Sequence, residues 1–212
     1  MDLSKWAKWL SEPSQKFLAS KIMSPAKFDK HHLLEVHGAT EATLRKILLI
    51  GLRKQKVTYE NAWSFLHEYD KTPGRGNNKG DFQNIVEILY GTPWTTVLTN
   101  NNDLNLCWEL WLDFAKKIRN DLSHGIRQHS PDTIEIALMI NASILIELDK
   151  EFNPRIGGSL FQDLTDLSPR LPRGSQSNDP KSLLGIKPKK QVQTKLSATQ
   201  AKIKADIVDR FI

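Results

Sequence analysis

Cysteine is almost absent from this chain of 212 residues, in which Cys107 is the single example. No disulfide can therefore form within the chain, and because Cys107 lies in an apolar stretch we expect a buried structural thiol. The sequence also lacks any apolar run near the ~20 residues that span a bilayer. Met1 to Ser24 alternates Trp, Lys and polar residues and has no signal-peptide core. These absences predict a cytoplasmic protein.

Sustained alternation of apolar and polar residues, the pattern of strands, is missing as well. Apolar residues recur instead at helical spacing, as in the stripe of Leu44, Ile47, Leu48 and Leu52. We therefore predict an all-α protein, with an antiparallel helical bundle over residues 31–152. An N-terminal helix within residues 1–30 is expected to pack on that bundle.

Several local signals place the helices within the predicted bundle. Thr40 and Thr58 are plausible helix starts, and the Gly-, Asn- and Pro-containing stretch at residues 72–80 predicts a flexible loop. The longest helix is predicted from Asp103 to Ser123, with Gly125 ending it. A second apolar helix is expected from Pro131 to Phe152.

The positive charge of the chain is concentrated near its C-terminus. Residues 169–212 contain ten Lys or Arg against three Asp or Glu, whereas the rest of the chain has 20 against 21. Pro, Gly and Ser accumulate after residue 152, so we predict a flexible basic linker at residues 153–194. Residues 195–212 are expected to form an amphipathic helix, with Lys202, Lys204 and Arg210 opposite its apolar side. This helix can dock on the bundle or on a partner. The basic charge of the tail suits contact with the phosphates of a nucleic acid, or it serves only to keep the tail solvated.

The hexapeptide from Arg119 to His124, RNDLSH, holds the candidate catalytic residues. Asn120 and His124 are four residues apart and share a helix face, whereas Arg119 and His124 diverge by about 140° on a continuous helix. A helix end at Gly125 can bring the two together and leave the imidazole exposed.

An Arg, an Asn and a His suit cleavage of RNA by its own 2′-hydroxyl. That reaction needs proton transfer, which His performs near neutral pH, and stabilisation of a negatively charged phosphorane, which Arg performs through paired hydrogen bonds. No metal and no other cofactor is required. Because one His is poorly placed to be both base and acid, the chemistry predicts a homodimer with two copies of the hexapeptide across one groove.

The hexapeptide resembles the signature of the HEPN superfamily, an Arg followed by a polar residue and, after several positions, a His. The resemblance covers roughly residues 30–152. It implies a helical bundle, a dimer, and metal-independent endoribonuclease activity of the kind found in toxins, antiphage defence and RNA processing. It also implies that Arg119 holds the scissile phosphate, that Asn120 positions these groups, and that His124 is the general acid and base. HEPN toxins paired with nucleotidyltransferase antitoxins usually carry a Tyr where this chain has Ile126, so regulation through that tyrosine is not expected.

Other polar residues are more simply explained by structure. We expect His31, His32 and His37 to be solvated or to cap helices, because no cysteine accompanies them. Glu41 and Arg45, four apart, suit an exposed ion pair, and a role for them at the active groove is the less favoured alternative. We expect no metal at the acidic residues Glu109, Asp113 and Asp121. For the tryptophans at positions 6, 9, 108 and 111, packing in the core or at an interface is favoured over stacking on nucleic-acid bases.

The predicted function is thus an RNA-cleaving enzyme of a toxin or defence system, held back by an antitoxin or regulatory protein that contacts the C-terminal tail. The alternative is a non-catalytic helical adaptor that joins a complex through the linker and the terminal helix. A DNA-binding regulator is less favoured, because the bundle is near neutral and has no clear helix-turn-helix signature.

Overall fold

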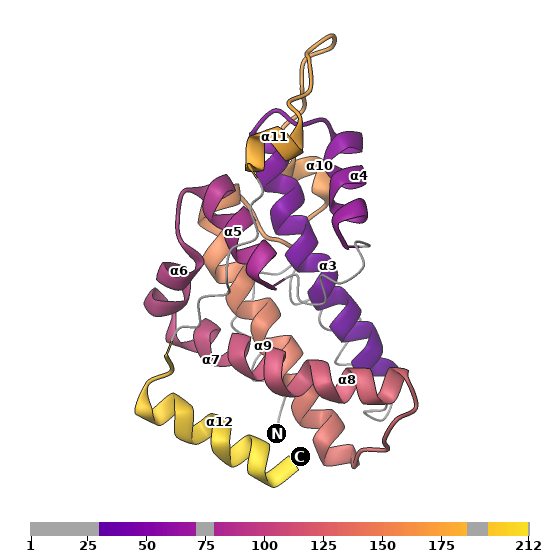
Figure 1. Cartoon of the computed structure of the whole chain (residues 1–212), viewed down its shortest axis with the longest axis vertical. Helices are drawn as coiled ribbons and strands as arrows, with labels where there is room; N and C mark the ends of the chain where they lie inside the picture. Colours follow the sequence, from indigo (N-terminus) through magenta and orange to yellow (C-terminus); the bar gives the residue numbers. More distant parts are fainter. Residues whose placement is uncertain (1–29, 71–78, 186–194, 212) are drawn as a thin grey trace.

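The computed structural model describes residues 30–70, 79–185 and 195–211, and within these ranges the regular structure is helical (Figure 1). The predicted all-α fold is confirmed. The predicted N-terminal helix, with Trp6 and Trp9, lies outside the described residues, as does most of the predicted loop at 72–80. The elements are α3 (Lys30–Lys54), α4 (Tyr59–Asp70), α5 (Lys79–Tyr90), α6 (Trp94–Asn100), α7 (Asn102–Leu110), the π-helical turn η1 (Trp111–Ala115), α8 (Lys116–Ser123), α9 (Pro131–Ile156), α10 (Leu164–Leu167), α11 (Pro180–Leu184) and α12 (Ala198–Phe211).

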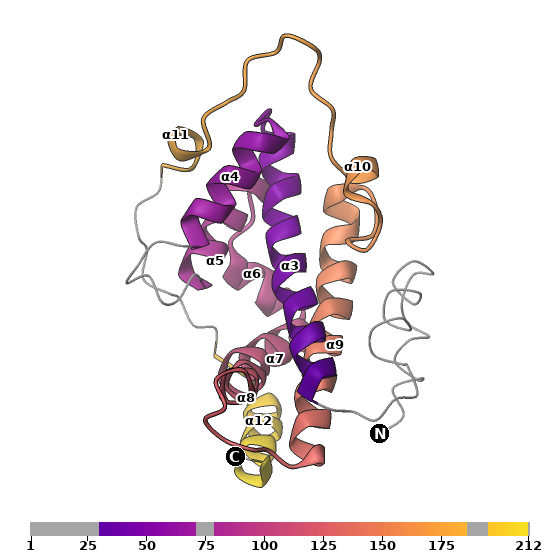
Figure 2. The ribbon, with the colours of Figure 1, turned by 90° about the vertical axis from the view of Figure 1, so that its right-hand side faces the viewer.

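The two longest helices, α3 and α9, lie side by side along the length of the molecule (Figure 2). Thr40 on α3 donates a hydrogen bond to Asn141 on α9, and Lys54 at the end of α3 donates to the carbonyl of Arg155 near the end of α9. The two helices therefore run in the same direction, and the predicted antiparallel arrangement does not hold for this pair. The long chain segment between them has room to return to the starting end before α9 begins.

The helices α7 and α8, joined by η1, cross the lower part of α3 and α9 (Figure 1). Trp108 and Trp111 are 1% and 4% exposed, so the prediction of core packing is confirmed for both. Trp108 packs in an aromatic cluster with Phe82 and Trp94, at ring-centroid distances of 5.7 and 4.9 Å. This cluster fixes α5 and α6 against the α7 end of the crossing segment.

Helix starts are only partly as predicted. Thr58 Oγ1 accepts a hydrogen bond from the backbone of Asn61 at 3.3 Å, as expected for the residue before α4. Thr40, in contrast, is buried inside α3, which begins at Lys30. Its hydroxyl proton is shared between the Val36 carbonyl of the same helix at 3.0 Å and Asn141 Oδ1 on α9 at 3.1 Å, so a side chain that suits a helix start serves an interhelical contact here.

The start of α9 follows the predicted pattern, but its end does not. Ser130 Oγ accepts from the Thr133 amide at 3.2 Å, and Pro131 occupies the first turn. The helix continues beyond Phe152 through Pro154, whose ring lies in the last turn, and ends at Gly157 with a left-handed φ of 83°.

The segment after α9 differs from the predicted flexible linker. Leu160, Leu167 and Leu184 are buried and join the core. The Asp149 carboxylate accepts from the Leu160 amide at 2.6 Å, and Arg53 donates to the Pro169 carbonyl at 2.6 Å. These long-range hydrogen bonds hold the segment against α9 and α3, although its composition alone indicates a flexible linker.

The C-terminal helix α12 docks on α7, one of the two outcomes considered for it. Gln200 donates to the Asn102 carbonyl at 2.5 Å, and Lys204 Nζ lies 2.6 Å from Asp113 and 3.5 Å from Glu109. Lys204 therefore faces the bundle, and its predicted place opposite the packed side of the helix is wrong. Across residues 30–70, 79–185 and 195–211, no helix is long and apolar enough to cross a membrane.

We expect Cys107 to react slowly with thiol reagents in the folded protein. Burial, followed by the nearby carboxylates of Glu147 and Asp103, raises the pKa of its thiol to about 12. At mildly alkaline pH the reactive thiolate is scarce, so modification should be at least ~100-fold slower than in denaturant. Following release of the chromophore from a disulfide reagent, with and without denaturant, measures this, and equal rates would contradict the burial.

Candidate functional site

The candidate hexapeptide spans the last turns of α8 and the residue that caps it. The His124 amide donates to the Asn120 carbonyl at 3.0 Å, and the Ile126 amide donates to the Asp121 carbonyl at 2.9 Å. Gly125 has a φ of 64°, which a residue with a Cβ rarely adopts. The predicted helix end at Gly125 is confirmed, and it leaves His124 exposed in the cap.

Arg119 and Asn120 meet directly, because the Arg119 guanidinium donates to Asn120 Oδ1 at 2.9 Å. Both residues are half-buried, and the Arg119 side chain is 31% exposed. An arginine carries five N–H donors. Asn120 therefore holds one side of the guanidinium while other donors stay accessible to a ligand.

Helix α3 supplies a second partner for Arg119. Glu41 Oε2 lies 3.7 Å from an Arg119 nitrogen, and Glu41 Oε1 lies 3.7 Å from Nε2 of His37. The His37 imidazole lowers the pKa of Glu41 below its ordinary value of 4.5, and the charges of Arg119 and Lys116 act in the same direction against burial. Glu41 thus lies at the candidate site, beside Arg119. From the sequence, this role was the less favoured alternative to an exposed ion pair.

His37 was expected to be solvated or to cap a helix, and this prediction is wrong. The residue is 0% exposed, and its ring stacks on that of Trp111 with centroids 5.2 Å apart and planes 16° apart. Within the described residues, neither ring nitrogen has a hydrogen-bond partner within normal distance. The sequence signal was present: His37 and Glu41 are four residues apart, and Leu33, Val36 and Thr40 place this side of α3 in the core.

A buried polar junction lies behind His37, where α3, η1 and α9 meet. Asn141 Oδ1 accepts from Trp111 Nε1 at 2.9 Å and from the Thr40 hydroxyl at 3.1 Å. The Asn141 amide donates to the Ala137 carbonyl at 2.8 Å, so both ends of this side chain are used. π-Helical turns are rare and often found at functional sites. Here Trp111 is the first residue of the turn, which leads directly into the helix that carries the hexapeptide.

The loop from α8 to α9 is bound back onto the hexapeptide. His129 Nε2 lies 3.0 Å from Asp121 Oδ2, and the two side chains are 4% and 16% exposed. Asp121, considered above as a cation ligand, thus has a histidine partner, and Asp113 has Lys204. Among the residues that the structure describes, no group of three or more His, Cys, Asp and Glu is placed to hold a metal ion.

The structure therefore joins two of the three predicted site residues. Arg119 and Asn120 are hydrogen bonded, whereas the exposed His124 caps the helix five residues after Arg119. Within the described part of the chain, the His124 ring is not hydrogen bonded to either side chain. The arrangement offers an oriented cation and an accessible acid–base group at one end of one helix.

Replacement of Glu41 by Gln should destabilise the protein at neutral pH by about 1 kcal/mol, because the carboxylate contacts His37 and Arg119. A carboxyl whose pKa is lowered by folding stabilises the native state above its unfolded pKa. That contribution is lost as the pH falls through the folded value. Denaturant unfolding at several pH values should show the two proteins converging in acid. Glu87→Gln is the matched control, and a deficit independent of pH would contradict the ionic role of Glu41.

In comparisons with known proteins, no family model, no curated protein and no solved structure matches the chain.

Proposed function

We propose that this protein is a metal-independent endoribonuclease that uses Arg119, Asn120 and His124. The supporting observation is that Asn120 and Glu41 orient a partly exposed guanidinium on the helix whose end presents the exposed imidazole of His124. The resemblance of the hexapeptide to the HEPN signature supports the same assignment.

The reaction follows from these groups. An imidazole removes the proton of a 2′-hydroxyl, and the 2′-oxygen attacks the adjacent phosphorus. The bond from phosphorus to the 5′-oxygen breaks, and a protonated imidazole gives that oxygen its proton. Arg119 would stabilise the charge on the non-bridging oxygens. The products are a 2′,3′-cyclic phosphate and a 5′-hydroxyl.

Two imidazoles serve this reaction better than one, which is why the proposal includes a homodimer. Ile126, two residues after His124, is 71% exposed, the most exposed of the large apolar residues in the described chain. An exposed apolar side chain beside the site suits a contact between two copies. The proposal also includes the biological role: the enzyme acts as a toxin or in antiphage defence, and a second protein restrains its activity.

Replacing Arg119 or His124 by Ala should each lower RNA cleavage in the presence of EDTA by at least ~100-fold, since each removes a group that acts in the transition state. Fragments separated on a gel and tested for a 2′,3′-cyclic end provide the measurement. Arg173→Ala and His67→Ala, at exposed positions elsewhere, serve as controls. Undiminished cleavage by either site variant, or an absolute need for a divalent metal, would refute the assignment. A folded wild-type protein that cleaves no RNA would favour the adaptor.

The dimeric site predicts that an excess of the His124→Ala chain inhibits the wild-type chain. A mixed dimer has one imidazole and lacks either the base or the acid. Activity should therefore fall with the fraction of wild-type homodimers after the chains are unfolded and refolded together. A loss proportional only to dilution would indicate that each chain works alone.

A further inference from the structure

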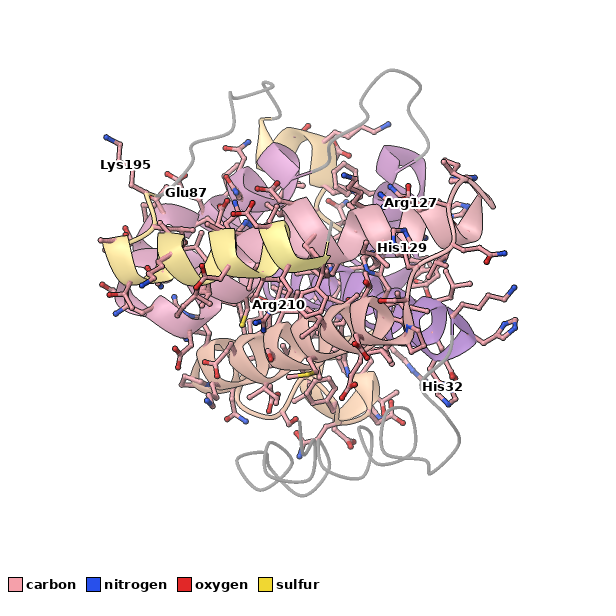
Figure 3. The ribbon with its side chains drawn as sticks, turned by 90° about the horizontal axis from the view of Figure 1, so that it is seen from below. His32, Glu87, Arg127, His129, Lys195 and Arg210 are labelled. Carbon is pink, nitrogen blue, oxygen red and sulfur yellow. The ribbon has the colours of Figure 1, made fainter. Side chains whose placement is uncertain are left out.

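A basic cleft lies between the loop that follows α8 and the end of α12. Its volume is about 640 Å³, and it opens widely to solvent. The lining residues are Arg127, Gln128, His129, Ser130, Asp132, Thr133, Arg210 and Phe211. Figure 3 views this end of the molecule from below, with Arg210 between the α12 and α9 ribbons and with Arg127 and His129 further towards α8.

The charge of this cleft favours an anion. Two arginines and a histidine line it, with Asp132 as the one carboxylate among the lining residues. Both arginines are exposed, and within the described residues neither has an ion pair with a carboxylate. Guanidinium groups with free donors bind phosphate oxygens through paired hydrogen bonds.

The wall of the cleft is fixed in place rather than formed by surface side chains alone. The His129 side chain is 4% exposed, and its bond to Asp121 ties the loop to α8. On the other side, the Lys204 contact with Asp113 holds α12 against the bundle. Arg127 and Arg210 thus reach the same cleft from segments that are 83 residues apart in sequence but separately anchored.

The position of the cleft connects it with the hexapeptide. Arg127 follows the exposed His124 by three residues, and Asp121, which binds the cleft residue His129, lies within the hexapeptide itself. Phe211 adds an aromatic ring to the basic lining. Basic groups beside an aromatic ring suit a single strand, whose phosphates pair with arginine and whose bases stack.

We infer that this cleft binds the phosphate backbone of single-stranded RNA next to the bond that is cut, with Arg127 and Arg210 each contacting a phosphate. The inference rests on the proposed function for the position of the cut. It makes the C-terminal helix part of the RNA-binding surface, in place of a tether or a site for a protein partner.

Binding of an uncleavable, fully 2′-O-methylated oligonucleotide tests this inference without requiring cleavage. The full-length Arg127→Ala and Arg210→Ala variants should each bind the labelled strand about 5- to 10-fold more weakly at low salt. A plot of log affinity against log salt should become shallower by about 0.7 for each arginine, as expected when one phosphate contact on a single strand is lost. Arg173→Ala removes the same charge from an exposed position outside the lining residues and should change neither quantity.

The outcomes separate this inference from the proposed enzyme activity. Altered binding with no cleavage by the wild type would support the cleft and refute the enzyme. Unchanged affinity and salt dependence in both cleft variants, verified as folded by circular dichroism, would overturn the inference even if the enzyme cleaves RNA. Loss of binding to an acidic protein partner, with RNA binding intact, would overturn it as well.

Discussion

The side chain of Asn141 is the constraint on which the arrangement of the site depends. A buried amide that is left unpaired is costly, so Asn141 favours the packing in which α3 and η1 both reach it. Its bond to Trp111 places that ring against His37, and His37 lies beside Glu41. The orientation of Arg119 on the surface therefore follows from a series of hydrogen-bonding, stacking and ionic contacts that begins in the core.

This arrangement also suits the electrostatics of an anion site. Glu41 and Asn120 restrain the guanidinium of Arg119 before any ligand arrives, which reduces the conformational entropy lost on binding. The Glu41 carboxylate partly offsets the positive charge, so a bound phosphate must compete with it for the same donors. The half-buried position of this pair gives the interaction more weight than a fully solvated pair would have.

Local sequence patterns predicted the features that depend on neighbouring residues. The helical class, the end of α8 at Gly125 and the start of α9 at Pro131 are of this kind. Features set by distant residues were missed. The shared direction of α3 and α9 depends on the path of the intervening chain, and the burial of His37 depends on a ring 74 residues away. Within the candidate site, the hexapeptide could be found from its sequence, but Glu41 became the partner of Arg119 only through tertiary packing.

The π-helical turn has a consequence for how related sequences would have to be compared. It adds a residue to the helical path between Trp108 in the core and Arg119 at the surface. Because the wide turn absorbs that residue, a chain that lacks it and continues as regular α-helix would keep Arg119 facing α3. Deletion of a residue from a regular α-helical turn would instead rotate everything after it by about 100°. Distant relatives that keep the same geometry can therefore be one residue shorter between these two points, and a one-residue gap in this stretch is compatible with the same placement of Arg119.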